Sequence, residues 1–252
     1  KKETDLFLPY FLNSKEKNMI EFNMTKDKGR ASIYKPNYSF LNRFPPNDLF
    51  NVESIENIYN VKTLDNLYSD KVISNVDFIK IDTQGSELKI LMGAKNKLLN
   101  VLGLEIEVEF SKIYTDQPLF ENVKDYIEKE GFIFIDFVTI NRWGKDKIDG
   151  FGNMVHADAL FLRDPDIIMD KEEDINLILI NKYIQILFVY NRLDILKYFE
   201  KKIHNNTILE KKIKKLIKIL EKDFFYLKLI NRIAYPIARV FGVKENKLHW
   251  FV

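Results

Sequence analysis

The sequence predicts an α/β domain built on a mostly parallel sheet, followed by an all-helical region. Short apolar runs alternate with helical patterns between residues 76 and 138, as they do where parallel strands are joined by right-handed helical crossovers. After Pro165 the pattern is helical throughout. The chain has 252 residues, 46% of them hydrophobic, which is enough to bury a core and too apolar for a disordered chain. We therefore expect domains at 1–165 and 166–252.

Short strands and a long loop are predicted for the first 50 residues. Apolar stretches at 6–12, 19–24 and 31–34 have β-type composition. The residues Asp27 to Gly29 form a turn signal between the second and third stretches, which predicts a hairpin. Prolines and asparagines then predict an irregular surface loop over 35–50, and such loops often border sites.

A strand and a helix joined by a glycine turn are predicted over residues 76–99. An apolar run ends at Asp82, Gly85 marks a tight turn, and helical spacing begins at Ser86 with Glu87 in the first turn. Ligands of open α/β sheets bind beyond the carboxyl ends of the strands, where this order places Asp82. Asp82 is therefore a candidate site residue, although aspartate also caps turns and helices without further function.

The remaining predicted elements alternate and then become helical. The strands are expected at 101–110, 132–138 and, after a loop at 142–156, 159–162. The helices are expected at 120–130, 172–190, 193–203, 208–222 and 224–241. Acids alternate with apolar residues in the first of these strands, at Glu105, Glu107 and Glu109. This pattern is typical of a strand with one solvated face, although Glu107 and Glu109 lie nearer the edge where ligands bind.

Composition argues against several functional classes. The absence of cysteine excludes disulfide scaffolds, thiolate nucleophiles and iron–sulfur clusters, and no histidine stands in an acidic cluster at metal-ligand spacing. Most basic residues are lysines, which read bases and phosphates less well than arginine, so we expect no nucleic-acid partner. The longest apolar stretch, 175–190, is shorter than the about 20 residues that cross a membrane. We therefore expect a cytoplasmic protein.

An amphipathic helix rich in lysine is predicted over 208–222. Its apolar residues recur at helical spacing, and lysines fill most of the other positions. One interpretation is docking through residues 207–222 on an anionic membrane at its inner face. The other, which we favour, is a surface helix that packs by its apolar stripe, because solvated lysine-rich faces are common.

Five sequence runs together resemble the FkbM family of S-adenosylmethionine-dependent methyltransferases. They are VKTLDNL (61–67), VDFIKIDTQGSELKILMGA (76–94), LEIEVEFSKIYTDQPLF (104–120), GFIFIDF (131–137) and ADALFL (157–162). The resemblance covers roughly residues 6–162. It implies a Rossmann-like methyltransferase sheet, S-adenosylmethionine as cofactor, and methyl transfer to a hydroxyl of a sugar, a glycan or a secondary metabolite.

The resemblance also implies roles for particular residues. Asp82 would accept the hydroxyl proton, with Glu87 and Glu107 in support. Cofactor contacts are expected from Asp82, Thr83, Gln84 and Gly85. A substrate site is expected from loop residues that follow strands, namely Tyr114, Gln117, Trp143 and His156. Core packing accounts for Trp143 equally well, and a lone histidine usually has no catalytic role.

The sequence departs from the family pattern in one respect. Family members carry an upstream strand with a glycine-rich cofactor turn, whereas the GxG motif at 150–152 lies late in a loop that no helix follows. We therefore expect this chain to lack the N-terminal strand and glycine loop of the domain, and an intact enzyme to need residues upstream of it. The alternative function is a non-catalytic binding or interaction module, placed near a membrane, that derives from the methyltransferase fold.

Overall fold

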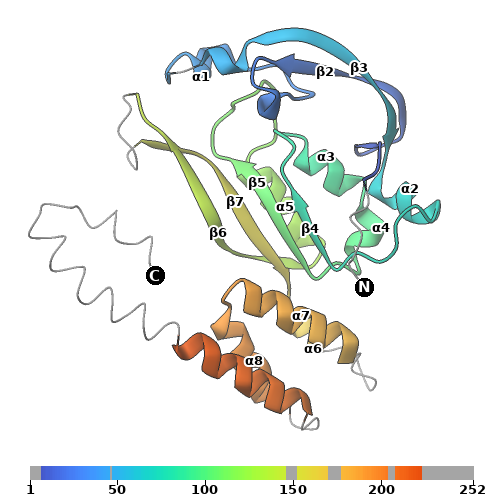
Figure 1. The fold of residues 1–252 in the computed structure, drawn as a ribbon, viewed down its shortest axis with the longest axis vertical. Helices are drawn as coiled ribbons and strands as arrows, with labels where there is room; N and C mark the ends of the chain where they lie inside the picture. The colour runs from blue at the N-terminus through green and yellow to red at the C-terminus, as the bar shows by residue number, and fades with distance from the viewer. Residues whose placement is uncertain (1–6, 46, 146–151, 170–176, 204–207, 223–252) are drawn as a thin grey trace, which may run out of the picture. The chain divides into compact units, whose positions relative to one another are not determined.

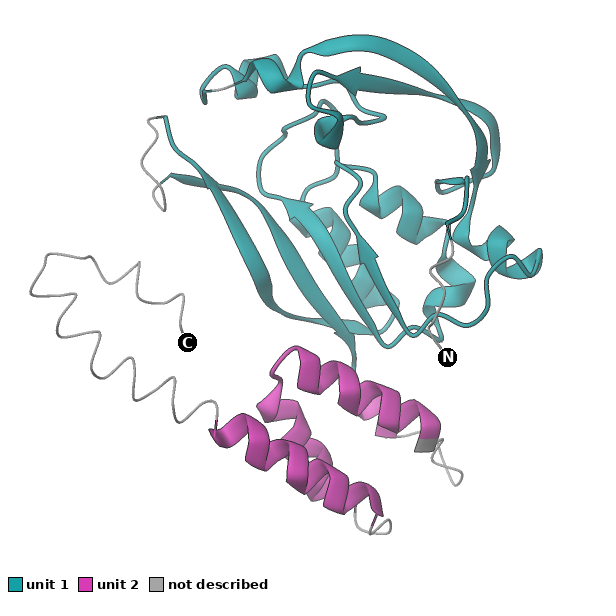
Figure 2. Cartoon of the chain, in the orientation of Figure 1, with its two compact units in different colours: residues 1–164 teal, residues 165–252 magenta. Residues whose placement is uncertain are grey.

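The computed structural model describes residues 7–45, 47–145, 152–169, 177–203 and 208–222 (Figure 1). The chain divides into two compact units, residues 1–164 and 165–252 (Figure 2). Two sheets lie in the first unit, and the described residues of the second unit form helices. The described part of the chain is thus mixed α/β. The helix predicted over 224–241 lies outside the described residues.

A three-stranded sheet opens the first unit. It contains β1 (Phe11–Leu12), β2 (Lys17–Thr25) and β3 (Val52–Lys62) in the order β1-β3-β2, with β1 parallel and β2 antiparallel to β3. The predicted hairpin between 19–24 and 31–34 is wrong, because β2 pairs along its length with β3 and meets the later segment only in a bridge from Asn23 to Ser32.

The turn after β2 explains this difference. Asp27 accepts a hydrogen bond from the Gly29 N–H at 3.1 Å and another from Arg30 Nε at 2.9 Å. These bonds wind Lys28–Arg30 into a short 3-10 helix, η1, so the chain does not return as a second strand. The predicted loop over 35–50 likewise contains two short helical segments, α1 (Tyr38–Leu41) and η2 (Asp48–Phe50).

A four-stranded sheet carries the main core of the first unit. Its strands are β4 (Phe78–Ile81), β5 (Gly103–Glu109), β6 (Phe132–Trp143) and β7 (Asn153–Arg163), in the order β4-β5-β7-β6. The expected mostly parallel pairing is wrong, because only β4 and β5 pair in parallel. The chain turns back after β6, and β7 inserts antiparallel between β5 and β6. Within the loop predicted over 142–156, residues 142–143 belong to β6 and residues 153–156 to β7.

Helices connect these strands and cover the sheet. The connecting helices are α2 (Leu64–Ser69), α3 (Glu87–Met92), α4 (Lys95–Leu98) and α5 (Phe120–Lys129). The single helix predicted from residue 86 to 99 is divided between α3 and α4 near Gly93, where the chain passes so close that a Cβ would lie 2.1 Å from the Asn13 carbonyl oxygen. Both α3 and α5 contact β5, and the buried core includes Leu91, Leu104, Ile106, Ile127 and Phe161.

The second unit is helical wherever it is described. Its helices are α6 (Pro165–Met169), α7 (Leu177–Val189), α8 (Leu193–Lys202) and a helix over 208–222. The apolar stripe of the last helix is buried, at Leu209, Ile213, Ile217 and Leu220. This burial is what the packing interpretation of the lysine-rich helix requires. No helix among the described residues is long and apolar enough to cross a membrane.

Candidate functional site

The turn after β4 is held from inside by a buried carboxylate. Glu87 Oε1 accepts hydrogen bonds from the Thr83 N–H at 2.8 Å, the Thr83 hydroxyl at 3.0 Å and the Gly85 N–H at 3.2 Å. Gly85 has φ +102°, and a Cβ there would lie 3.3 Å from both Gln117 and Tyr34. Glycine is therefore required by conformation and by space. Glu87 is buried at the first turn of α3, where its carboxylate supports the turn.

The side chain of Gln84 links the turn to the rest of the site. Its Nε2 donates to Glu107 Oε2 at 2.8 Å and to Asp82 Oδ1 at 3.1 Å. Its Oε1 lies 3.0 Å from the Tyr114 hydroxyl, which also donates to the Arg30 carbonyl oxygen at 2.7 Å. Gln84 itself adopts a left-handed backbone, with φ 56°, that turns its amide toward these partners. The network fixes one carboxylate oxygen of Glu107.

The three acids of β5 are buried, so the predicted solvated face is wrong. Glu105, Glu107 and Glu109 are only 8%, 8% and 2% exposed. Glu105 pairs with Lys80, Glu107 accepts from Gln84, and the Gln117 side chain favours the charged form of Glu109. Lys80 and Gln84 lie 25 and 23 residues from their acids, and Gln117 lies in the loop after β5. The alternation within β5 alone gave no indication of them.

Burial changes the acidity of this cluster. It raises the pKa of Glu87 to about 7, against the hydrogen bonds from the turn that lower it. Burial also raises the pKa of Glu107, and repulsion from Asp82 adds to this while His156 opposes it. The pKa of Glu109 is raised well above its usual value by burial and by repulsion from Glu87 and Glu107. The site thus holds protons at higher pH than exposed carboxylates do.

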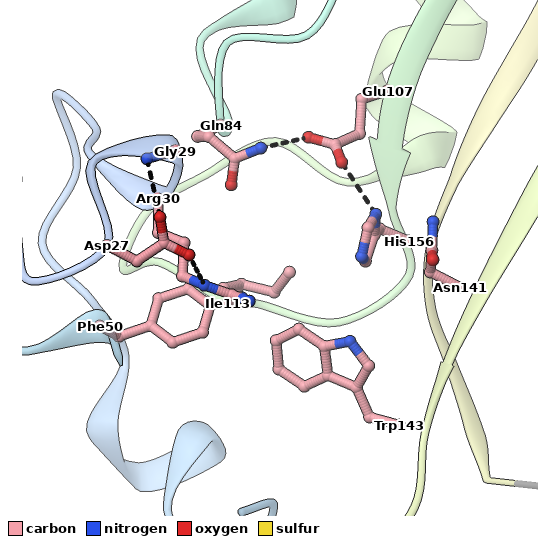
Figure 3. Close-up of a pocket in the computed structure, with 10 residues that line it drawn as sticks. All are labelled: Asp27, Gly29, Arg30, Phe50, Gln84, Glu107, Ile113, Asn141, Trp143 and His156. Carbon is pink, nitrogen blue, oxygen red and sulfur yellow. Dashed lines mark hydrogen bonds and ion pairs between the residues drawn. The ribbon is translucent and has the colours of Figure 1, made fainter. Parts of the chain in front are cut away.

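A cavity of about 340 Å³ opens beside this network (Figure 3). Four of the predicted site residues line it, namely Gln84, Glu107, Trp143 and His156. The other lining residues come from the η1 turn, η2, the segment after β5 and the end of β6, and they are Asp27, Gly29, Arg30, Phe50, Ile113 and Asn141. The sequence of residues 27–29 predicts a turn. Nothing in the local pattern indicated that this turn folds back over the sheet.

A carboxylate and an imidazole meet in the cavity wall. His156 is on β7, the strand next to β5, and its Nδ1 lies 2.8 Å from Glu107 Oε1 (Figure 3). This nitrogen is buried and is not aligned for a hydrogen bond, so the contact is an ion pair when the imidazole is protonated. The second nitrogen, Nε2, is the one left to meet a ligand. The pair can therefore take up a proton from a bound molecule and stabilise the resulting charge.

Aromatic rings form another part of the cavity wall. The Trp143 ring centroid lies 5.8 Å from that of Phe50 and 6.2 Å from that of His156. The Arg30 guanidinium lies over the Phe50 ring, with Cζ 4.7 Å from the centroid, and its Nε donates to Asp27. An apolar ring face beside charged and amide groups suits a ligand with both an apolar face and hydroxyls.

A sequence profile of the methyltransferase FkbM domain matches residues 6–134, slightly more than half of the chain. The chain belongs to the FkbM methyltransferase family. The resemblance of the five sequence runs to this family is confirmed. No curated protein and no solved structure matches the chain. The matched range contains the turn after β4 and Glu107, whereas Trp143 and His156 lie beyond it.

Several residues predicted from the FkbM resemblance lie outside the cavity wall. Asp82 follows β4 as expected and is exposed, with its carboxylate near Gln84 and Glu107. Thr83, Gly85 and Glu87 build the turn. Tyr114 and Gln117 are buried and do not line the cavity. The side-chain oxygen of Gln117, Oε1, accepts a hydrogen bond from the Tyr114 backbone N–H. No cluster of metal-ligating side chains occurs within the described ranges.

The buried Glu87 predicts an unusual dependence of FkbM-domain stability on pH. Because its pKa is raised from 4.5 to about 7 on folding, the folded state binds the proton more tightly. The free energy of unfolding should then fall as pH rises from about 4.5 to about 7, by about 3 kcal/mol from this group. Glu87→Gln keeps an oxygen for the three turn donors and should remove much of this fall, which urea unfolding across the range would measure.

The matched control for this experiment is Glu121→Gln. Glu121 occupies the first turn of α5, as Glu87 does in α3, but it is exposed. It should leave the pH dependence unchanged. Equal pH dependence in the wild type and in Glu87→Gln would contradict the assignment of a buried, proton-binding Glu87.

Proposed function

We propose that the chain is an S-adenosylmethionine-dependent O-methyltransferase that acts on a hydroxyl of a sugar or another small polyhydroxylated molecule. The observation that carries the proposal is the Glu107–His156 pair in a cavity walled by Trp143, in a chain of the FkbM family. The cavity is of monosaccharide size, at the lower end of the roughly 300–1,000 Å³ of small-molecule sites. It is therefore assigned to the methyl acceptor.

His156 and Glu107 supply the base for this reaction. S-adenosylmethionine, when bound, supplies an activated methyl group, so the protein needs chiefly to position the hydroxyl and remove its proton. His156 Nε2 takes that proton, and the neighbouring Glu107 carboxylate compensates the imidazolium charge. Gln84 holds the second oxygen of Glu107 in place. This assignment moves the proton acceptor from Asp82, which does not line the cavity.

The acceptor hydroxyl is oriented by the rest of the wall. A sugar ring has an apolar face that stacks on an aromatic ring, and Trp143 offers such a ring. Asn141, Arg30 and Asp27 line the same cavity and provide an amide, a guanidinium and a carboxylate for the remaining hydroxyls. Donors and acceptors are thus both present around one apolar face, which is the pattern that favours a carbohydrate over an apolar metabolite.

The turn after β4 fits the charge of the cofactor. S-adenosylmethionine presents an ammonium, a sulfonium and ribose hydroxyls, and the exposed Asp82 carboxylate lies at the carboxyl end of β4 with acceptor capacity for such groups. Asp82 and the turn formed by Thr83–Gly85 would hold the cofactor. We assign the cofactor there rather than to the cavity, because the cavity has room for one small molecule.

Calorimetric titration with S-adenosylhomocysteine, the demethylated product, tests this function. We expect saturable binding that Asp82→Asn weakens by about tenfold or more, since it removes a charge-assisted hydrogen bond. Asp125→Asn, at an exposed position of α5, is the matched control and should bind as the wild type does. Absence of binding both to the wild-type chain and to a form extended upstream, which the family pattern requires for an intact enzyme, would contradict the methyltransferase proposal.

The sugar-sized cavity walled by Trp143 also supports one alternative function, a non-catalytic binding module. Such a module would keep the cavity and bind a sugar without transferring a methyl group. Binding of a monosaccharide in the absence of S-adenosylhomocysteine binding, with no methylated product, would support this alternative.

A further inference from the structure

The helix over 208–222 carries two opposite stripes. Its apolar stripe is buried in the second unit, as described above. Four exposed lysines form the other stripe at spacing i, i+4, i+7 and i+11, namely Lys211, Lys215, Lys218 and Lys222. The spacing places them along one side of the helix, over a length of about 16 Å. The helix thus presents a straight row of positive charge away from its packed side.

These four lysines lack ion-pair partners within the described residues. Their neighbours differ, because Lys214 pairs with Glu210, Lys212 donates to Asn181, and Glu221 pairs with Lys197 of α8. Both acids of the helix are therefore used by other lysines. Like charges at i, i+4 destabilise a helix. A row of unneutralised lysines is consequently better suited to an external anionic partner than to the stability of this unit.

Two exposed isoleucines lie on the same side as the lysines. Ile208 is 82% exposed and Ile219 is 40% exposed. Together with Lys215 and Lys222 they fall at spacing i, i+7, i+11 and i+14, which is one face of a helix. Exposed β-branched apolar residues among lysines are the composition of a surface that meets lipid headgroups and the outer ends of acyl chains.

We propose that this face docks on an anionic phospholipid bilayer. The lysines lie over headgroup phosphates, and Ile208 and Ile219 enter the interface. Lysine, a flexible point charge, suits the diffuse field of a lipid surface, whereas bidentate recognition of nucleic-acid phosphates and bases uses arginine. The docking differs from that of an inserted amphipathic helix, because the apolar stripe stays packed within the unit. It does not depend on the methyltransferase proposal.

Cosedimentation of the full chain with vesicles tests the proposal. Each lysine near an anionic surface contributes about fivefold in partitioning, so replacing Lys211, Lys215, Lys218 and Lys222 by Gln should reduce binding by on the order of several hundredfold. The vesicles are phosphatidylcholine containing about one-third phosphatidylglycerol, and binding should be lost in pure phosphatidylcholine and at high salt. Glutamine is a good helix former, and circular dichroism of the variant checks that the helix is retained.

The matched control removes the same charge from the first unit. Lys15, Lys17, Lys95 and Lys129 are exposed there, and replacing them by Gln should leave vesicle binding nearly unchanged. Ile208→Ser with Ile219→Ser should weaken binding but keep its salt dependence. Equal binding by both quadruple variants, no binding by the wild type, or tighter binding to duplex DNA than to anionic vesicles would overturn the proposal.

Discussion

Replacing His156 by Gln should lower kcat for methyl transfer by a hundredfold or more, because a positioned base contributes about 10²–10⁴ to rate. Glutamine retains a polar side chain of similar reach but cannot accept the proton. KM for the acceptor should change much less than kcat, because the aromatic wall and the other polar lining groups remain. The measurement is steady-state transfer of a labelled methyl group to the acceptor, with binding of S-adenosylhomocysteine as the check on folding.

A second variant, Glu107→Gln, tests whether Glu107 supports proton transfer to His156 or only helps to bind the substrate. Glutamine at this position can still accept from Gln84, but it no longer compensates an imidazolium. Because the pKa of Glu107 is raised by burial, activity of the wild type should fall as pH drops through a value above that of an exposed carboxylate. Glu107→Gln should lower the rate at all pH values, because no carboxylate then compensates the imidazolium charge.

Asp82→Asn provides the decisive comparison. Asp82 lies near Glu107 but outside the cavity wall, so it should affect cofactor binding more than kcat. If Asp82→Asn removes turnover while His156→Gln keeps a near-normal rate, the proton acceptor is Asp82, as the family resemblance first implied. The assignment of the base to His156 would then be wrong.

The turn after β4 was predictable because its signals are local. The apolar run, Asp82, Gly85 and the helical spacing follow one another within a short stretch, and the structure places β4, the turn and α3 in that order. Gly85 is required by its own φ, and Glu87 by the donors of its own turn. Where a residue's role is set by near neighbours in the chain, sequence patterns are sufficient.

The cavity was only partly predictable, because tertiary packing determines which residues line it. Arg30 and Phe50 reach it from the turn after β2 and from η2, segments whose local signals indicated only a turn and a loop. The burial of Glu105, Glu107 and Glu109 depends in turn on a Lys80 ion pair, the Gln84 amide and Gln117. A single alternating strand cannot reveal such partners, and it resembles a strand with one solvated face.

Arg163, which sequence reasoning did not single out, joins three separate segments at the end of β7. It is 5% exposed. Its Nε and Nη2 donate to the Val101 carbonyl oxygen at 3.2 and 3.1 Å, and its other bonds reach the carbonyl oxygens of Leu98 and Glu130. Its guanidinium also lies 3.8 Å from the Phe132 ring centroid. One side chain thus fixes the end of α4, the entry to β5 and the turn before β6.

Arg163→Met should therefore lower the free energy of unfolding by about 3–5 kcal/mol, because it leaves buried carbonyl groups without donors. Arg163→Lys should recover only part of this, since one ammonium cannot reproduce the planar fork. Urea unfolding followed by Trp143 fluorescence, in a Trp250→Phe background, measures the effect.

The control is Arg142→Met, at an exposed arginine of β6 that donates to the Gly152 carbonyl oxygen. It should cost at most about 0.5 kcal/mol. Equal losses at both positions would mean that Arg163 acts as a surface residue and that other contacts join these segments.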